Sequence, residues 1–99
     1  MYIYNVTVSL DDGIENEWVA WMKEIHIPDV LRTGLFLENR ICKLLSDDLP
    51  VTYAVQYTFN AMSDLHKYKE KFAPGLQKKH AEKFKDKFTA FRTVLEIVE

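Results

Sequence analysis

Three polar side chains stand where the sequence pattern otherwise places hydrocarbon: Asn5, His26 and His80. Asn5 lies within an alternating run that is typical of a β-strand, and both histidines lie on the apolar stripes of predicted helices. A carboxamide both donates and accepts hydrogen bonds, and an imidazole exchanges a proton near neutral pH. These residues are therefore the first candidates for a binding or catalytic site.

Each candidate also has a purely structural interpretation. Asn5 could satisfy backbone groups at a strand edge, and His80 could bond to a carbonyl. His26 follows Met22 by four positions and could reach the mouth of a pocket. It could instead cap the end of its helix before Pro28, where the helix dipole favours the protonated ring. The pattern favours the capping interpretation for His26.

No metal or cofactor motif accompanies these residues. Two helices that run antiparallel across a sheet would place His26 near His66, and His80 near Ile14 or Trp18. The sequence therefore predicts that the two histidines lie at opposite ends of the helical layer and share no metal site. Zinc-type pairs of Cys or His, a phosphate-binding loop and a nucleophile elbow are also missing from the chain. We expect no metal and no cofactor.

The elements that must position the candidates follow from apolar periodicity. Alternation predicts strands over residues 2–10, 35–45, 51–59 and 89–98. Helical spacing predicts one helix over residues 14–25 that Pro28 bends or ends, and a second over 63–84 that Pro74 kinks or splits. Asp12 and Ser63 are the predicted N-caps. The order β-α-β-β-α-β predicts an α+β, ferredoxin-like domain over residues 1–99, with two helices on one face of a four-stranded antiparallel sheet.

Composition and charge narrow the classes of protein. Cys42 is the only cysteine, which fits a reducing compartment, and the first residues form neither a signal peptide nor a membrane span. We therefore expect a cytoplasmic protein with no membrane partner. Residues 61–99 hold 9 Lys/Arg and 6 Asp/Glu, but the lysines mix with acids along an amphipathic helix. This mixture favours a solvated face over a nucleic-acid surface.

Both faces of several predicted strands carry large apolar side chains. Ile3 stands opposite Tyr2, and Val94 stands opposite Leu95. Two helices cover only one side of such a sheet, and an uncovered apolar side usually marks an interface. The sequence therefore predicts a homodimer that packs its sheets face to face.

Several segments together resemble a known family. They are the run from Trp18 to Val30, Thr33-Gly34-Leu35-Phe36, Tyr53-Ala54-Val55-Gln56-Tyr57, Phe72-Ala73-Pro74 and Phe91-Arg92-Thr93. The chain is similar over essentially its whole length to a bacterial family of small proteins of unknown function. That family looks like a branch of the dimeric α+β barrel superfamily, which includes antibiotic-biosynthesis monooxygenases, haem-degrading monooxygenases, muconolactone isomerases and stress-response proteins. The resemblance implies a fold and a dimer, and it implies no single activity.

The resemblance also suggests which residues to compare. Haem-degrading members use an Asn on the first strand, an aromatic residue and a His on the second helix, and the positions here are Asn5, Tyr68 and His80. Tyr68 stands where those members have Trp, and Pro74-Gly75 lengthens its separation from His80. Both departures argue against haem binding.

Two hypotheses of function remain. The first is a dimeric binding or assembly module whose pocket holds a small apolar or aromatic ligand, with candidate ligand-binding residues Asn5, Trp18, Tyr57, Tyr68 and His80. The alternative is a cofactor-free monooxygenase or isomerase acting on a small aromatic or enolisable compound. An enclosed cavity of several hundred Å³ lined by Asn5 and a histidine would favour the enzyme, and a filled core would favour the module.

Overall fold

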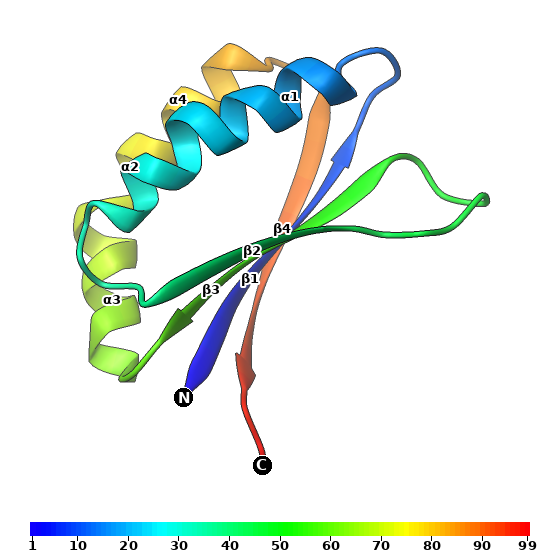
Figure 1. Cartoon of the computed structure of the whole chain (residues 1–99). Coiled ribbons are helices and arrows are strands. Elements are labelled where there is room, and N and C mark those ends of the chain that lie inside the picture. Colours follow the sequence, from blue (N-terminus) through cyan, green and yellow to red (C-terminus); the bar gives the residue numbers. More distant parts are fainter.

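The computed structural model describes all 99 residues and centres on one antiparallel sheet (Figure 1). The strands are β1 (Tyr2–Leu10), β2 (Glu38–Lys43), β3 (Thr52–Phe59) and β4 (Phe88–Glu96), in the order β2-β3-β1-β4. Each helical crossover skips one strand, so the two βαβ halves interleave. The α+β, ferredoxin-like fold predicted from the sequence is confirmed.

The first crossover is one continuous helical stretch with a widened turn in its middle. It consists of α1 (Glu15–Trp21), the π-helix η1 (Met22–His26) and α2 (Ile27–Leu31). The backbone N–H of Ile27 donates to the carbonyl of Met22, five residues earlier, and Pro28 falls in the first turn of α2, where its missing N–H costs nothing. The widened turn therefore carries the helix past the proline. It also shifts His26 around the axis relative to a uniform α-helix.

The second crossover is split, as predicted, into α3 (Met62–Lys71) and α4 (Ala73–Lys83). Phe72 joins them and Pro74 lies in the first turn of α4. The predicted caps are wrong: the N-cap residues are Ile14 and Ala61, and neither helix start has a side-chain cap. Both crossovers lie on the same side of the sheet (Figure 1).

Successive side chains of β1 point alternately to the two sides of the sheet, which differ in environment. Tyr4, Val8 and Leu10 are buried beneath the helices. Asn5 points to the opposite side, where its Nδ2 donates to Thr93 Oγ1 at 3.2 Å and its Oδ1 accepts from Gln56 Nε2 at 3.3 Å. We call this side, which no helix covers, the open face. From the strand register, it carries Ile3, Asn5, Thr7 and Ser9 of β1, Glu38, Arg40 and Cys42 of β2, Thr52, Ala54, Gln56 and Thr58 of β3, and Thr89, Phe91, Thr93 and Leu95 of β4.

Strand β4 is the most exposed element of the sheet. It pairs only with β1, so its outer edge has no partner, and most of its side chains are exposed. Phe91 is 61% exposed and Leu95 is 43% exposed, both on the open face. Long edge strands with exposed apolar side chains favour pairing with another chain.

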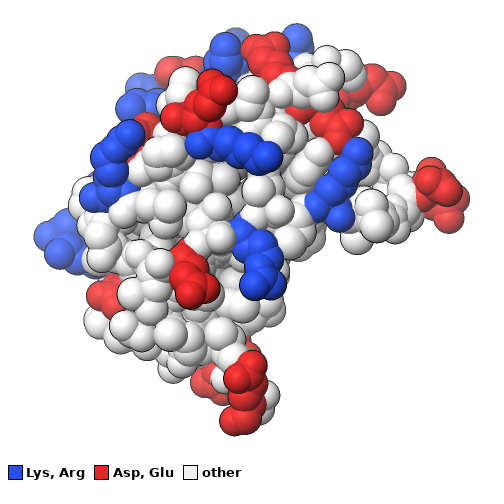
Figure 2. Space-filling model, in the orientation of Figure 1, with Lys and Arg blue, Asp and Glu red and all other residues white.

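The remaining surface is charged with both signs. Figure 2 shows acidic and basic side chains interspersed over the upper part of the molecule, around a largely uncharged centre. Several belong to ion pairs, including Lys43–Glu15 at 2.7 Å and Lys83–Glu17 at 3.4 Å. None of the helices is long and apolar enough to cross a lipid bilayer.

Candidate functional site

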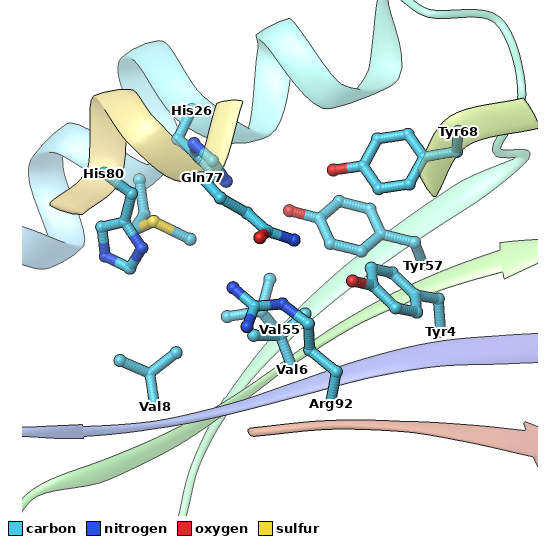
Figure 3. Close-up of a pocket in the computed structure, with 11 residues that line it drawn as sticks. Tyr4, Val6, Val8, His26, Val55, Tyr57, Tyr68, Gln77, His80 and Arg92 are labelled. Carbon is cyan, nitrogen blue, oxygen red and sulfur yellow. The ribbon is translucent and has the colours of Figure 1, made fainter. Parts of the chain in front are cut away.

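A hollow lies between the helix-covered side of the sheet and the helices (Figure 3). It encloses about 390 Å³ of empty space up to its open mouth, and the centre of a water molecule can occupy about 30 Å³ of it. A space of that size holds about two waters. The lining residues are Tyr4, Val6, Val8, Met22, His26, Val55, Tyr57, Tyr68, Gln77, His80 and Arg92.

Two histidines flank one end of the hollow, and their rings are close together. The ring centroids of His26 and His80 are 5.6 Å apart, and the ring of Trp21 stacks against both, at 5.2 Å and 5.5 Å. The expectation that the two histidines lie at opposite ends of the helical layer is therefore wrong. That expectation assumed that the first crossover is a regular α-helix and that the two crossover helices run antiparallel. The π-helix η1 makes the first crossover irregular. No group of three or more His, Cys, Asp or Glu side chains gathers there or elsewhere.

Trp18 fixes the chemical form of His80. Its indole Nε1–H donates to His80 Nε2 at 2.9 Å, in a buried hydrogen bond. Because Nε2 accepts, the single proton of the neutral ring is on Nδ1. Figure 3 shows the imidazole at the wall of the hollow, and no protein group accepts the Nδ1 proton. His80 therefore presents a hydrogen-bond donor to the hollow.

Both imidazoles are held in the neutral form. Burial, with smaller contributions from His26 and Arg92, lowers the pKa of His80 to about 4. Burial likewise lowers the pKa of His26 to about 4, with Asp29 opposing the shift and Arg92 adding to it. At neutral pH both imidazole rings are therefore uncharged. The structure gives no sign of His26 capping a carbonyl, and the ring lines the hollow instead.

Three tyrosines form the other end of the hollow. The rings of Tyr4 and Tyr68 meet edge to face at 5.7 Å, and Phe36 packs against Tyr57 at 5.3 Å and against Tyr68 at 4.9 Å. In Figure 3 the hydroxyls of Tyr4, Tyr57 and Tyr68 point the same way, toward Gln77. Burial raises the pKa of all three phenols, so they stay protonated at neutral pH.

Arg92 and Gln77 close the hollow from opposite sides (Figure 3). Arg92 rises from β4 and is exposed, whereas Gln77 descends from α4 and is half-buried. The guanidinium of Arg92 forms no ion pair, and its charge lowers the pKa of Tyr4 against the larger, opposing effect of burial. The mouth therefore consists of two long side chains, one of them an unpaired cation.

The structure separates the candidates suggested by the sequence. Tyr57, Tyr68 and His80 line the hollow, and Trp18 is fully buried behind His80. Asn5 does not join them, because it lies on the open face of the sheet and bonds there to its strand neighbours. The arrangement of Asn5, Tyr68 and His80 around one pocket is therefore not formed.

Sequence reasoning missed three residues of the site: Tyr4, Gln77 and Arg92. Two of them carried a usable signal. Tyr4 shares the strand side of Val6 and Val8, and Arg92 stands on the side of β4 that alternation assigns to the helices, where a charge is unexpected. Gln77 follows the stripe residue Leu76 and gave no such signal.

The strand order and the two crossovers on one side of the sheet define a small ferredoxin-like α+β protein. The chain belongs to the DUF4286 family, a domain of unknown function whose model matches residues 1–98. None of the curated protein sequences matches it.

Solved structures share the fold at low sequence identity. A dimeric ferredoxin-like protein from an uncultured marine organism superimposes with a TM-score of 0.74 at 12% identity, covering 100% of this chain and 96% of that one. A variant of MhuD with two manganese protoporphyrin IX molecules bound per active site gives the same values. A variant of SnoaB, a cofactor-independent oxygenase from Streptomyces nogalater, has a TM-score of 0.71 at 13% identity, covering 99% and 94%. Similarity at this level establishes the fold alone.

Proposed function

We propose that the protein is a homodimeric binding module that holds a small aromatic molecule in the hollow between its sheet and helices. The observation that carries the proposal is a set of polar groups that face one space and have no protein partners. These are the hydroxyls of Tyr57 and Tyr68 and the Nδ1–H of His80; the hydroxyl of Tyr4 lies beside them, within hydrogen-bonding reach of Arg92. None of these atoms is sealed from solvent without a partner, so they are open to a molecule in the hollow, and polar groups that converge on a partly apolar pocket favour a ligand.

Ligand entry requires the mouth to move. The space of about 30 Å³ open to water centres is too small for an aromatic ring. Arg92 and Gln77 are long and unbranched at the β-carbon, and neither forms an ion pair; Arg92 interacts with the hydroxyl of Tyr4. A rotamer change at these two residues would widen the mouth of the hollow, and exposed side chains make such changes in nanoseconds or less.

The proposed dimer buries the open face of the sheet. Phe91 and Leu95 are the exposed apolar groups on it, and Thr58 Oγ1 is buried without a hydrogen-bond partner. A second copy packed on this face would cover the apolar groups and the free edge of β4 together. The dimeric state of the ferredoxin-like protein of similar fold supports self-association.

A matched pair of variants tests the dimer. Leu95→Asp places a charge on the open face, and Ile25→Asp places one on the helical layer, where Ile25 is 47% exposed. Sedimentation velocity should give a dimer for the parent and for Ile25→Asp, and a monomer for Leu95→Asp. Circular dichroism checks that both variants fold. A parent that sediments as a monomer at micromolar concentration would rule out the dimer.

Equilibrium dialysis with nitrobenzene tests the pocket, because binding of this small, uncharged aromatic compound depends mainly on its shape. We expect saturable binding at one site per chain, accompanied by quenching of Trp18, which lies directly behind His80. Absence of saturable binding, together with unchanged fluorescence, would overturn the proposed function.

A second candidate function is an isomerase or oxygenase that needs no cofactor. The neutral imidazole of His26 favours it, since this ring lines the hollow and makes no hydrogen bond to another side chain. Such an enzyme would accelerate the exchange of deuterium into the enolisable carbons of an aromatic ketone such as 2-tetralone, and His26→Ala would abolish the acceleration. The space open to water centres, far below several hundred Å³, favours the binding module.

A further inference from the structure

We infer that the ligand carries a negatively charged or strongly accepting oxygen, such as a phenolate, an enolate or a carboxylate, and that Arg92 and the three tyrosine hydroxyls hold it. The inference rests on the proposed function and adds the chemical class of the ligand. Its basis is the imbalance between hydrogen-bond donors and acceptors in the hollow.

Donors dominate the polar lining. The hydroxyls of Tyr4, Tyr57 and Tyr68 can each donate, and their raised pKa values keep the protons in place at neutral pH. Among the lining residues there is no Asp or Glu. A ligand oxygen can accept from these hydroxyls and also from the Arg92 guanidinium and the His80 Nδ1–H, which can only donate; a ligand that supplies only donors would leave those two groups unpaired at a cost.

His80 adds a donor that cannot be exchanged for an acceptor at low cost. The Trp18 indole N–H occupies Nε2, so the alternative tautomer, with its proton on Nε2, would set two N–H groups against each other. The Nδ1–H is thus fixed toward the space that the ligand would fill. This fixed tautomer distinguishes His80 from an ordinary histidine, which can present either a donor or an acceptor.

Arg92 supplies the only formal charge in the lining. Its guanidinium has no carboxylate partner, and the one acidic group near the histidines, Asp29, is already paired with Arg32. An exposed arginine keeps its charge without desolvation, and it forms short, strong hydrogen bonds to an anionic oxygen. The mouth of the hollow is therefore electropositive, which also attracts an anion on approach.

The floor of the hollow fits the rest of such a ligand. Val6, Val8 and Val55 form an apolar surface on the sheet (Figure 3), and Met22 of η1 also lines the hollow. A flat ring on the valines would direct its oxygen toward the tyrosine end. The lining thus separates an apolar part from a donor-rich part, as an aromatic oxyanion requires.

4-Nitrophenol tests the inference, because its phenolate is yellow and its neutral form is not. At a pH near its own pKa, titration with the protein should increase the yellow absorbance, since the donors favour the anion. Arg92→Leu should weaken phenolate binding at least about tenfold, the loss of one charge-assisted hydrogen bond. Arg40→Leu makes the same change on the open face and should leave binding unaltered. Gln77→Glu should also weaken phenolate binding, because it adds a negative charge at the mouth.

Nitrobenzene separates this inference from the proposed function. The parent and Arg40→Leu should both bind nitrobenzene, since Arg40 lies outside the hollow, and circular dichroism checks that Arg92→Leu is folded. If nitrobenzene binds but nitrophenolate does not, or if the yellow absorbance falls on binding, the inference about charge is wrong and the pocket remains. If neither compound binds, the proposed function fails with it.

Discussion

Lowering the pH from 7 to 5 should destabilise the fold through its two buried histidines. Both have a pKa of about 4 in the folded protein, below the ordinary value of 6.5, because burial disfavours the charged ring. The unfolded chain therefore binds more protons than the folded chain between pH 6.5 and pH 4. Stability is full above pH 6.5 and is lost as the pH falls through this window.

The magnitude follows from the two pKa values. For His80, moving from pH 7 to pH 5 costs about 2 kcal/mol, and His26 adds a similar amount, for a total of about 4 kcal/mol. A domain of this size commonly has only about 5–15 kcal/mol of stability, so the effect is a large fraction of it. Glu15 contributes little in this range, because hydrogen bonds from Lys43 and Tyr53 hold its pKa below its usual 4.5.

Urea unfolding followed by tryptophan fluorescence, at pH 7, 6 and 5, measures the loss. His80→Gln offers a matched variant, since its amide oxygen can still accept the Trp18 N–H but does not titrate. The pH dependence should fall by about half in this variant. His66→Gln is the control, because His66 is exposed on α3, and it should behave like the parent.

The reasoning would be refuted by a free energy of unfolding that changes by less than about 1 kcal/mol between pH 7 and pH 5. An unaltered pH dependence in His80→Gln would likewise show that His80 is not the titrating group.

Two further predictions concern the hydrogen bond behind the hollow and the backbone of the turns. Trp18→Phe keeps an aromatic ring but removes the N–H that donates to His80. It should therefore lower the free energy of unfolding, measured in urea, by about 1–3 kcal/mol. It should also raise the pKa of His80, measured by NMR titration, toward its ordinary value, and a pKa that stays near 4 would show that burial alone sets it. Gly34→Ala should destabilise by about 1 kcal/mol, because Gly34 has φ +78° although its Cβ would meet no neighbour. Gly75→Ala in α4, which has equal space and no positive φ, should be neutral or stabilising by up to about 1 kcal/mol, and equal effects at the two glycines would contradict the backbone argument.

Much of the fold could be predicted from local sequence pattern. Strict alternation in β1 and β3, and the prolines that interrupt the two helical runs, locate the elements within a few residues. The helix starts could not be predicted from capping residues, because the true N-caps, Ile14 and Ala61, lie two positions from Asp12 and Ser63 and neither helix start has a side-chain cap. In both cases packing of the apolar stripe decides where the helix begins.

The candidate site was less predictable, because it depends on rotation about the helix axis and on which side of the sheet faces the helices. The π-helical turn η1 brings His26 beside His80, and the apolar spacing of the sequence does not predict a π-helical turn. Asn5 drew attention as a polar residue in a strand, but it belongs to the hydrogen-bonded network of the open face. Arg92 indicates the site better than Asn5 does, because strand alternation places its charged side chain on the side of the sheet that the helices cover.

The most direct test of the account is a two-dimensional proton–nitrogen NMR spectrum recorded while 4-nitrophenol is added to the labelled protein. The side-chain amide of Gln77 reports on the mouth, the Trp18 indole N–H on the inner wall, and the side-chain amides of Asn5 and Gln56 on the open face. The account predicts that the Gln77 and Trp18 signals shift together with one saturation curve while the Asn5 and Gln56 signals stay in place. Shifts confined to Asn5 and Gln56, or no shift at all, would contradict it.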